Sequence, residues 1–116
     1  MSAPRSLVRL RHMLDHAREA VAMVRGRTRA DLDADRPLNL ALVRLLEIVG
    51  EAAGRVPEEE RALYPRIPWS EIVSLRNRLI HGYNTVDFDI LWEIVSQDLP
   101  ALIQALKEAL AREGSA

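Results

Sequence analysis

Cysteine, long apolar runs and internal repeats are all missing from this sequence. With no cysteine among the 116 residues, disulfides and thiolate metal sites are excluded. No apolar run approaches the roughly 20 residues that a membrane-spanning helix needs. The N-terminus carries arginines but no apolar segment of the kind found in secretory signals. We therefore expect a cytoplasmic protein with no membrane span.

Segments that alternate apolar and polar residues, as a half-buried β-strand would, are also missing. Apolar residues make up 48% of the chain and charged residues 28%, a balance typical of a globular protein. The length suits one domain with a sizeable core, so residues 1–116 are expected to form a single domain.

Apolar residues recur at helical spacing in four segments, which predicts four main helices. They cover residues 7–25, 38–55, 69–81 and a last helix from Asp87 to about residue 110. Short helical turns are expected within 31–37 and at 57–60. Asp87 should cap the last helix, and Pro100 should kink it. The predicted fold is an all-α four-helix bundle with one or two additional short helices.

The net charge of −1 hides an asymmetry along the chain. Residues 1–30 hold seven arginines against Asp15 and Glu19, giving this segment +5 and leaving −6 for the remainder. A basic first helix can receive an RNA backbone, although a solvated helix face explains the same residues.

The most informative stretch runs from residue 76 to residue 83 and contains Arg76, Asn77, His81 and Tyr83. Histidine can accept a proton from a 2′-hydroxyl near neutral pH, and arginine can bind two phosphate oxygens at once. Tyrosine adds a hydroxyl and a flat face. This combination favours chemistry on RNA phosphodiesters, whereas a structural ion pair and a helix-capping histidine are the alternative interpretation.

A helical wheel, at about 100° per residue, puts Arg76 inside an apolar arc. A charge there needs a partner, for which Glu47 and Glu51 are candidates, or else it lines a cleft. His81 lies roughly 140° away on the same wheel, so one ideal helix would keep the two side chains apart. Gly82 is expected to end the helix, leaving His81 free to turn towards Arg76 or towards a second copy of the motif.

The motif matches the Arg-x4-His-x-Tyr signature of the HEPN superfamily, and the chain resembles its HepT-like toxins. Further matching segments are IVGEAA at 48–53, IPW at 67–69, HGY at 81–83, VD at 86–87 and LP at 99–100. They occur in order from about residue 35 to residue 105, so the resemblance covers most of the chain and implies a HEPN-type four-helix bundle.

The resemblance implies a metal-independent endoribonuclease without a cofactor, acting as a homodimeric toxin. His81 would be the base, Arg76 would stabilise charge on the phosphorus, and Asn77 would orient the histidine or phosphate. A nucleotidyltransferase antitoxin would silence the enzyme by adenylylating Tyr83, although that tyrosine can also simply pack the turn. The alternative is a non-catalytic HEPN module that binds a nucleotide or the nucleotidyltransferase.

Two further features have mainly structural interpretations. His12 and His16 stand four residues apart, a spacing that can share a metal ion, but no third ligand is evident and the family chemistry needs no metal. Trp69 and Trp92 occupy helical positions that favour core anchors over base-stacking platforms.

Overall fold

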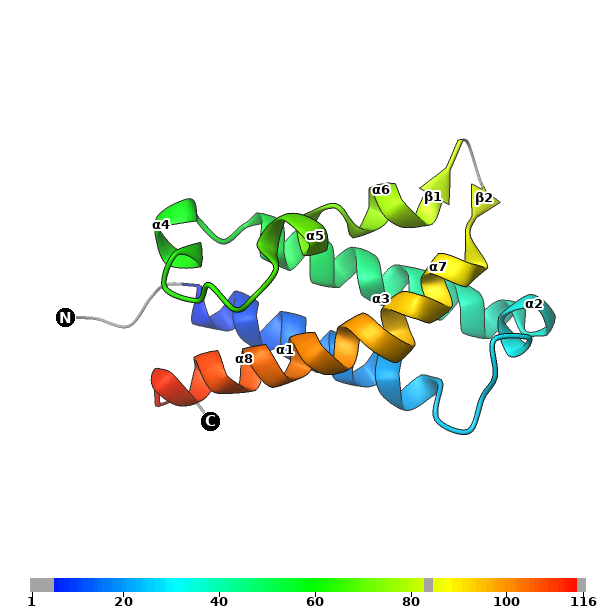
Figure 1. Ribbon diagram of the computed structural model, residues 1–116, viewed down its shortest axis with the longest axis horizontal. Helices are drawn as coiled ribbons and strands as arrows, with labels where there is room; N and C mark the ends of the chain where they lie inside the picture. The colour runs from blue at the N-terminus through cyan, green and yellow to red at the C-terminus, as the bar shows by residue number, and fades with distance from the viewer. Residues whose placement is uncertain (1–5, 83–84, 115–116) are drawn as a thin grey trace.

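The computed structural model describes residues 6–82 and 85–114 and is an all-α bundle (Figure 1). Its helices form where apolar residues recur at helical spacing. Its long helices are α1 (Leu7–Met23), α3 (Arg36–Gly54) and α8 (Leu99–Arg112). The connections between passes hold two short helices, α2 (Asp31–Ala34) and α4 (Glu58–Arg61). The predicted all-α bundle with additional short helices is confirmed.

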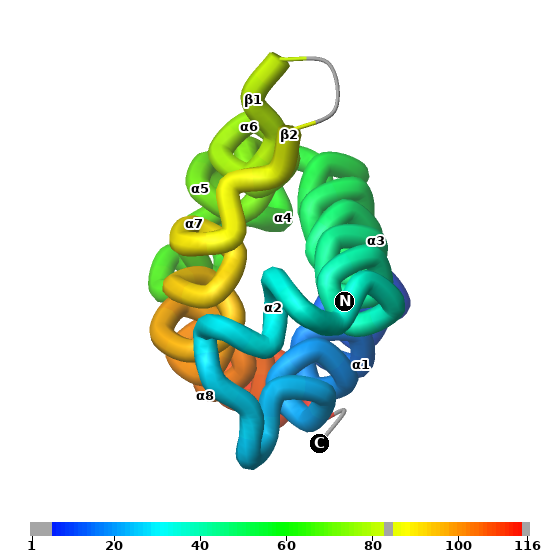
Figure 2. Tube along the Cα trace, turned by 90° about the vertical axis from the view of Figure 1, so that its right-hand side faces the viewer, coloured from blue at the N-terminus to red at the C-terminus, as the bar shows by residue number. Residues whose placement is uncertain are grey.

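The other two passes of the bundle are divided into short elements. The third pass consists of α5 (Trp69–Val73) and α6 (Leu75–Leu79), followed by the strands β1 (Ile80–His81) and β2 (Thr85–Val86). The fourth pass consists of α7 (Phe88–Glu93), the π-helix η1 (Ile94–Asp98) and α8. In the end-on view of Figure 2, the β1–β2 hairpin extends from one edge of the bundle, beyond α6 and α7.

The core forms where α1 packs against α3 and α8. Leucines from all three helices are fully buried there, among them Leu10, Leu42, Leu46 and Leu106. Burying one such side chain contributes roughly 1.5–3 kcal/mol. The bundle is therefore held mainly by aliphatic packing.

Two helix ends follow the sequence closely. Asp35 caps α3, because its Oδ1 accepts a hydrogen bond from the backbone N–H of Leu38 at 3.0 Å. Gly26 follows α1 with a φ of 72°, a left-handed conformation that a residue with a Cβ rarely adopts. Both ends lie within two residues of the predicted boundaries.

The expectation of one continuous helix over residues 69–81 is wrong. The helix is interrupted at Ser74 and ends at Leu79, and the next two residues form β1. Ile80 pairs with Val86 and His81 pairs with Thr85 in an antiparallel ladder. The expectation that His81 caps a helix is therefore also wrong, since His81 belongs to a strand.

His81 lies in a strand because the chain must reverse its direction within a few residues after α6. Gly82, with a φ of 67°, reverses the direction directly after His81. The backbone N–H of Asp87 then donates to the carbonyl of Leu79 at 2.8 Å, which satisfies a carbonyl left open at the end of α6. The ladder is only two residues long on each side, too short for an alternating pattern to be visible in the sequence.

The π-helical segment η1 lies just before Pro100, the residue expected to kink the last helix. Proline has no N–H to donate, and its ring crowds the carbonyl four residues earlier. A π-helical turn widens the helix locally, and such turns are among the recognised causes of a helix kink. Pro100 then sits in the first turn of α8, where the missing N–H costs little.

The close contact between α3 and α5 leads to a stability prediction. A Cβ on Gly50 would lie 3.1 Å from the backbone oxygen of Ile72, whereas a Cβ on Gly54 would meet nothing within 4 Å. Gly54→Ala should therefore stabilise the chain by about 0.5–1 kcal/mol, the usual gain from alanine in a helix. Gly50→Ala should instead destabilise it, as urea unfolding would measure. Equal stabilisation by both variants would show that α5 moves away without cost.

Candidate functional site

Arg76 lies on the first turn of α6 and points its guanidinium towards α3. Its Nε is 3.2 Å from Oε2 of Glu47, so Glu47 is the carboxylate partner of the two that were expected. The side chain of Arg76 is 65% exposed. The expected burial of Arg76 is therefore wrong: Ile72, Leu75 and Leu79 are buried, while the guanidinium of Arg76 extends to Glu47 on α3 and stays exposed.

The pairing with Glu47 leaves most of the Arg76 guanidinium free. Arginine carries five N–H donors, and only the one on Nε bonds to a partner in the part of the chain that the structure describes. Glu47 is held from its other side by Arg44, whose Nη1 is 3.8 Å from Oε1. The two terminal nitrogens of Arg76 are therefore oriented and available to an incoming anion.

Arg76 also borders a small pocket. This pocket has a volume of about 160 Å³ and lies between α3 and the α5–α6 pass. Its lining is Leu46, Glu47, Gly50, Glu51, Val73 and Arg76. Both alternatives raised for Arg76 are thus realised, since it has a carboxylate partner and lines a cleft.

His81 lies on β1 with its side chain 58% exposed. Its Nε2 is 3.7 Å from Oδ2 of Asp87, a distance for charge attraction but too long for a hydrogen bond. The other oxygen of Asp87 caps α7, accepting from the N–H of Ile90 at 3.0 Å. Asp87 is therefore fixed by the fold, and it presents one carboxylate oxygen to the imidazole.

The sequence pattern does not predict the place of Asp87 beside His81, although its predicted role as the cap of the last helix is confirmed. A usable signal exists: an aspartate six residues after a histidine, across a glycine turn, faces back towards it when the turn closes as a hairpin. The pattern also misses Arg78, which pairs with Asp98 at 3.4 Å and ties α6 to η1.

The predicted site residues thus lie on adjacent elements without contacting one another. Within residues 6–82 and 85–114, no hydrogen bond or ion pair joins Arg76 to His81. Asn77 is exposed on α6, and its amide has no partner among these residues. Tyr83, the expected modification site, lies outside the described residues.

The histidine pair on α1 shows no metal-site geometry. Nδ1 of His16 lies 2.6 Å from the carbonyl oxygen of His12, so this ring binds its own helix. Across the described ranges, no group of three histidine, cysteine, aspartate or glutamate side chains is arranged to hold a metal ion. His12 instead lines a second pocket, together with residues of α3.

Trp69 and Trp92 pack against the core, as expected of anchors. The indole N–H of Trp69 donates to the carbonyls of Tyr64, at 3.1 Å, and Arg61, at 3.2 Å. This fixes the entry to α5 and, through it, the start of the pass that carries Arg76.

Among the residues that the structure covers, no helix combines the length and apolar character needed to cross a bilayer.

Comparison with known proteins gives consistent matches over nearly the whole chain. The family described as "Ribonuclease HepT-like" matches residues 13–109. A candidate RNase of Caldanaerobacter subterraneus subsp. tengcongensis is 37% identical, over 97% of this chain and 99% of its own. A ribonuclease HepT candidate of Thermococcus cleftensis is 38% identical, over 77% of this chain and 84% of its own. No solved structure matches the chain at a significant level.

The two tasks of Asp87 can be separated by substitution. Asp87→Ala removes the cap of α7 and should lower the free energy of unfolding by about 1 kcal/mol. Asp87→Asn keeps an oxygen that can cap the helix, so it should lower the free energy of unfolding by only a few tenths of about 1 kcal/mol. The same substitution removes the charge that faces His81. Urea unfolding of both variants measures the difference. An equal loss in both would mean that the charge, and not the cap, holds this junction.

Proposed function

The chain belongs to the HepT-like ribonuclease family of the HEPN superfamily, and we propose that it is an endoribonuclease that uses Arg76 and His81. The observation that carries the proposal is the exposure of two side chains on the adjacent elements α6 and β1. They present an arginine with free donors and a histidine that faces a fixed carboxylate. The absence of a metal requirement follows from the family resemblance and is part of the proposal.

The proposed reaction begins when His81 takes the proton of a 2′-hydroxyl. The 2′ oxygen then attacks the adjacent phosphorus, and the bond from phosphorus to the 5′ oxygen breaks. One product carries a 2′,3′-cyclic phosphate, and the other carries a 5′-hydroxyl after the leaving oxygen has gained a proton from water or from an imidazolium. Arg76 stabilises the extra negative charge on the phosphoryl oxygens in the transition state.

Three neighbours support this chemistry. Asp87 presents Oδ2 to the imidazole of His81, 3.7 Å from its Nε2, and so limits how the ring turns. Glu47 holds Arg76 by Nε and leaves the other nitrogens for phosphate. Asn77, exposed one residue later, can donate to a phosphate oxygen.

We propose that the active form is a homodimer. Arg76 and His81 are both exposed, and within the described residues no hydrogen bond or ion pair joins them, so we infer that a second chain completes the cleft around the phosphate. Val73, on the same pass, is 42% exposed beside the pocket of Arg76 and offers apolar surface to a second copy. Two motifs facing one cleft would attract a phosphate through two arginines.

Regulation by a nucleotidyltransferase antitoxin completes the proposal, with this chain as the toxin. Tyr83 follows His81 by two residues, so an adenylyl group on its hydroxyl would bring negative charge and bulk close to the proposed base. RNA would be excluded by repulsion and by sterics. A non-catalytic module that binds a nucleotide or the nucleotidyltransferase is the competing hypothesis.

His81→Ala is the central test. The purified protein, in chelator and without a partner, should cleave RNA to 2′,3′-cyclic phosphate products, and the variant should be slower by about 10²–10⁴-fold. Stability should change by less than about 0.5 kcal/mol, because His81 is exposed. His16→Ala, on α1, is the control and should cleave normally.

Two outcomes would contradict this assignment. Full activity of His81→Ala would remove it as the base, and loss of cleavage in chelator would point to a metal-dependent enzyme. If neither protein cleaves RNA, intact mass decides: an added adenylyl group identifies a silenced enzyme, and an unmodified mass favours the binding module.

Arg76→Ala should slow cleavage by about 10²–10³-fold, because the transition-state phosphate loses one of its donors. The matched control is Arg66→Ala, which removes an arginine whose pairing with Glu108 lies on the surface, away from α6. Single-turnover cleavage of a labelled RNA measures both. A fully active Arg76→Ala enzyme would exclude this arginine from catalysis.

A further inference from the structure

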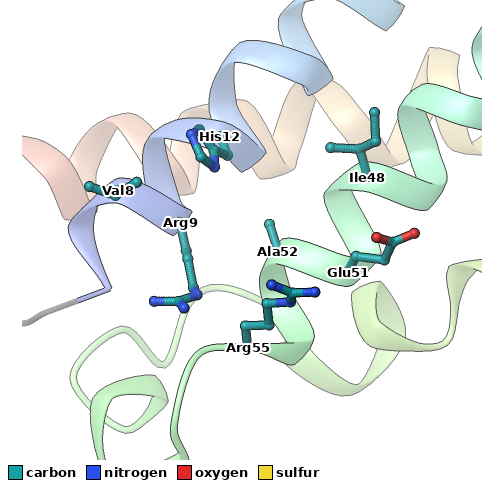
Figure 3. Close-up of a pocket in the computed structure, with 7 residues that line it drawn as sticks. All are labelled: Val8, Arg9, His12, Ile48, Glu51, Ala52 and Arg55. Carbon is teal, nitrogen blue, oxygen red and sulfur yellow. The ribbon is translucent and has the colours of Figure 1, made fainter.

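A second pocket, separate from the one beside Arg76, opens between the start of α1 and the end of α3. Its volume is about 340 Å³, and its lining is Val8, Arg9, His12, Ile48, Glu51, Ala52 and Arg55 (Figure 3). Arg9 and His12 belong to α1, and Arg55 is the residue that directly follows α3. The two arginines approach the pocket from opposite walls.

The charges in this pocket are not balanced within the described part of the chain. Arg9 and Arg55 have no hydrogen bond or ion pair through their side chains there, unlike Arg27, Arg29, Arg44 and Arg66. The one acidic residue of the lining, Glu51, is engaged by Arg44 at 3.3 Å. Figure 3 shows its carboxylate turned away from Arg9. Among the residues that the structure describes, the guanidinium groups of Arg9 and Arg55 therefore have no acidic partner in this pocket.

The pocket also has an apolar side. Val8 is 60% exposed, the largest exposure among the large hydrophobic residues of the described chain, and Ile48 and Ala52 lie across from it on α3. Guanidinium groups bind phosphate oxygens in pairs, and exposed aliphatic side chains can cover the face of a sugar or base. The chemistry of the two sides together matches one nucleotide unit.

We propose that this pocket is an anchoring subsite for single-stranded RNA, in which Arg9 and Arg55 bind one backbone phosphate. Val8, Ile48 and Ala52 support the attached ribose and base, and His12 adds a ring N–H donor. The proposal rests on the proposed ribonuclease function, because it makes the anchored RNA the substrate of Arg76 and His81. Glu51 lines both pockets, so the anchor and the site of Arg76 are neighbours across α3.

The test is equilibrium binding of a short fluorescein-labelled single-stranded RNA, followed by fluorescence anisotropy over a range of salt concentrations. His81→Ala serves as the background, so that the RNA stays intact. Adding Arg9→Ala and Arg55→Ala should weaken binding at least about tenfold. The slope of log K against log salt should also fall by roughly 0.7 for each phosphate that the protein no longer neutralises.

The matched control removes the same charge elsewhere. Arg18→Ala with Arg25→Ala takes two exposed arginines from the N-terminal segment, outside the pocket, and should leave affinity and slope nearly unchanged. Arg9→Lys with Arg55→Lys keeps the charge without the paired donors, so it should restore the salt slope while recovering only part of the affinity. Thermal melting of each variant confirms folding.

The outcomes separate this inference from the nuclease. Equal weakening by the pocket pair and the control pair would overturn the anchor, since it would show only general attraction to a basic segment. Unchanged binding by the pocket pair, or no RNA binding by the His81→Ala chain, would also overturn it. RNA that binds through Arg9 and Arg55 but is never cleaved by the unsubstituted protein of unmodified mass would refute the nuclease and leave the anchor standing.

Discussion

The reversal of the chain between Leu79 and Asp87 is the constraint on which the arrangement of the site depends. One backbone hydrogen bond, from the N–H of Asp87 to the carbonyl of Leu79, closes this reversal at 2.8 Å. It ends α6, aligns β1 with β2 and brings Asp87 to the start of α7. The position of His81, its exposure and its facing carboxylate all follow from that closure. The third and fourth passes of the bundle are joined at the same point.

Much of the fold is predictable because aliphatic residues at helical spacing leave few alternatives. Leu10, Leu42 and Leu106 are buried as their periodicity indicates, and Asp35 and Asp87 cap helices as their types favour. The hairpin is not predictable, because two residues on each strand carry no readable pattern. The interruption at Ser74 escapes prediction for a related reason: serine is tolerated within helices, and only the packing against α3 shows where the helix is broken.

The geometry around the predicted site residues is only partly predictable from the sequence. The sequence leaves Glu47 and Glu51 as partners for Arg76, and the structure selects Glu47. The exposure of Arg76 is misjudged because a helical wheel gives only the direction in which a side chain leaves the helix, and a long arginine can still place its guanidinium in solvent. Asp87 acquires its place beside His81 from tertiary closure, which no spacing rule for a single helix contains. The caps, which depend on residue type within one element, are therefore predicted correctly, and the side-chain arrangement around His81, which depends on two elements, is not.

The close approach of α3 to α5 at Gly50 has a consequence for an RNA that would occupy both proposed sites. The backbones meet there, and residues of α3 line both pockets, so this helix is their common support. It carries Glu47, the partner of Arg76, and leads to Arg55, eight residues further along the sequence, a rise of about 12 Å along a helix. A helix of this length is stiff, so under both proposals it would set the distance between the anchored phosphate and Arg76. An RNA held at one end would be presented to His81 at a set number of nucleotides from its anchored phosphate, and the position of the cut would be chosen by length before it is chosen by base.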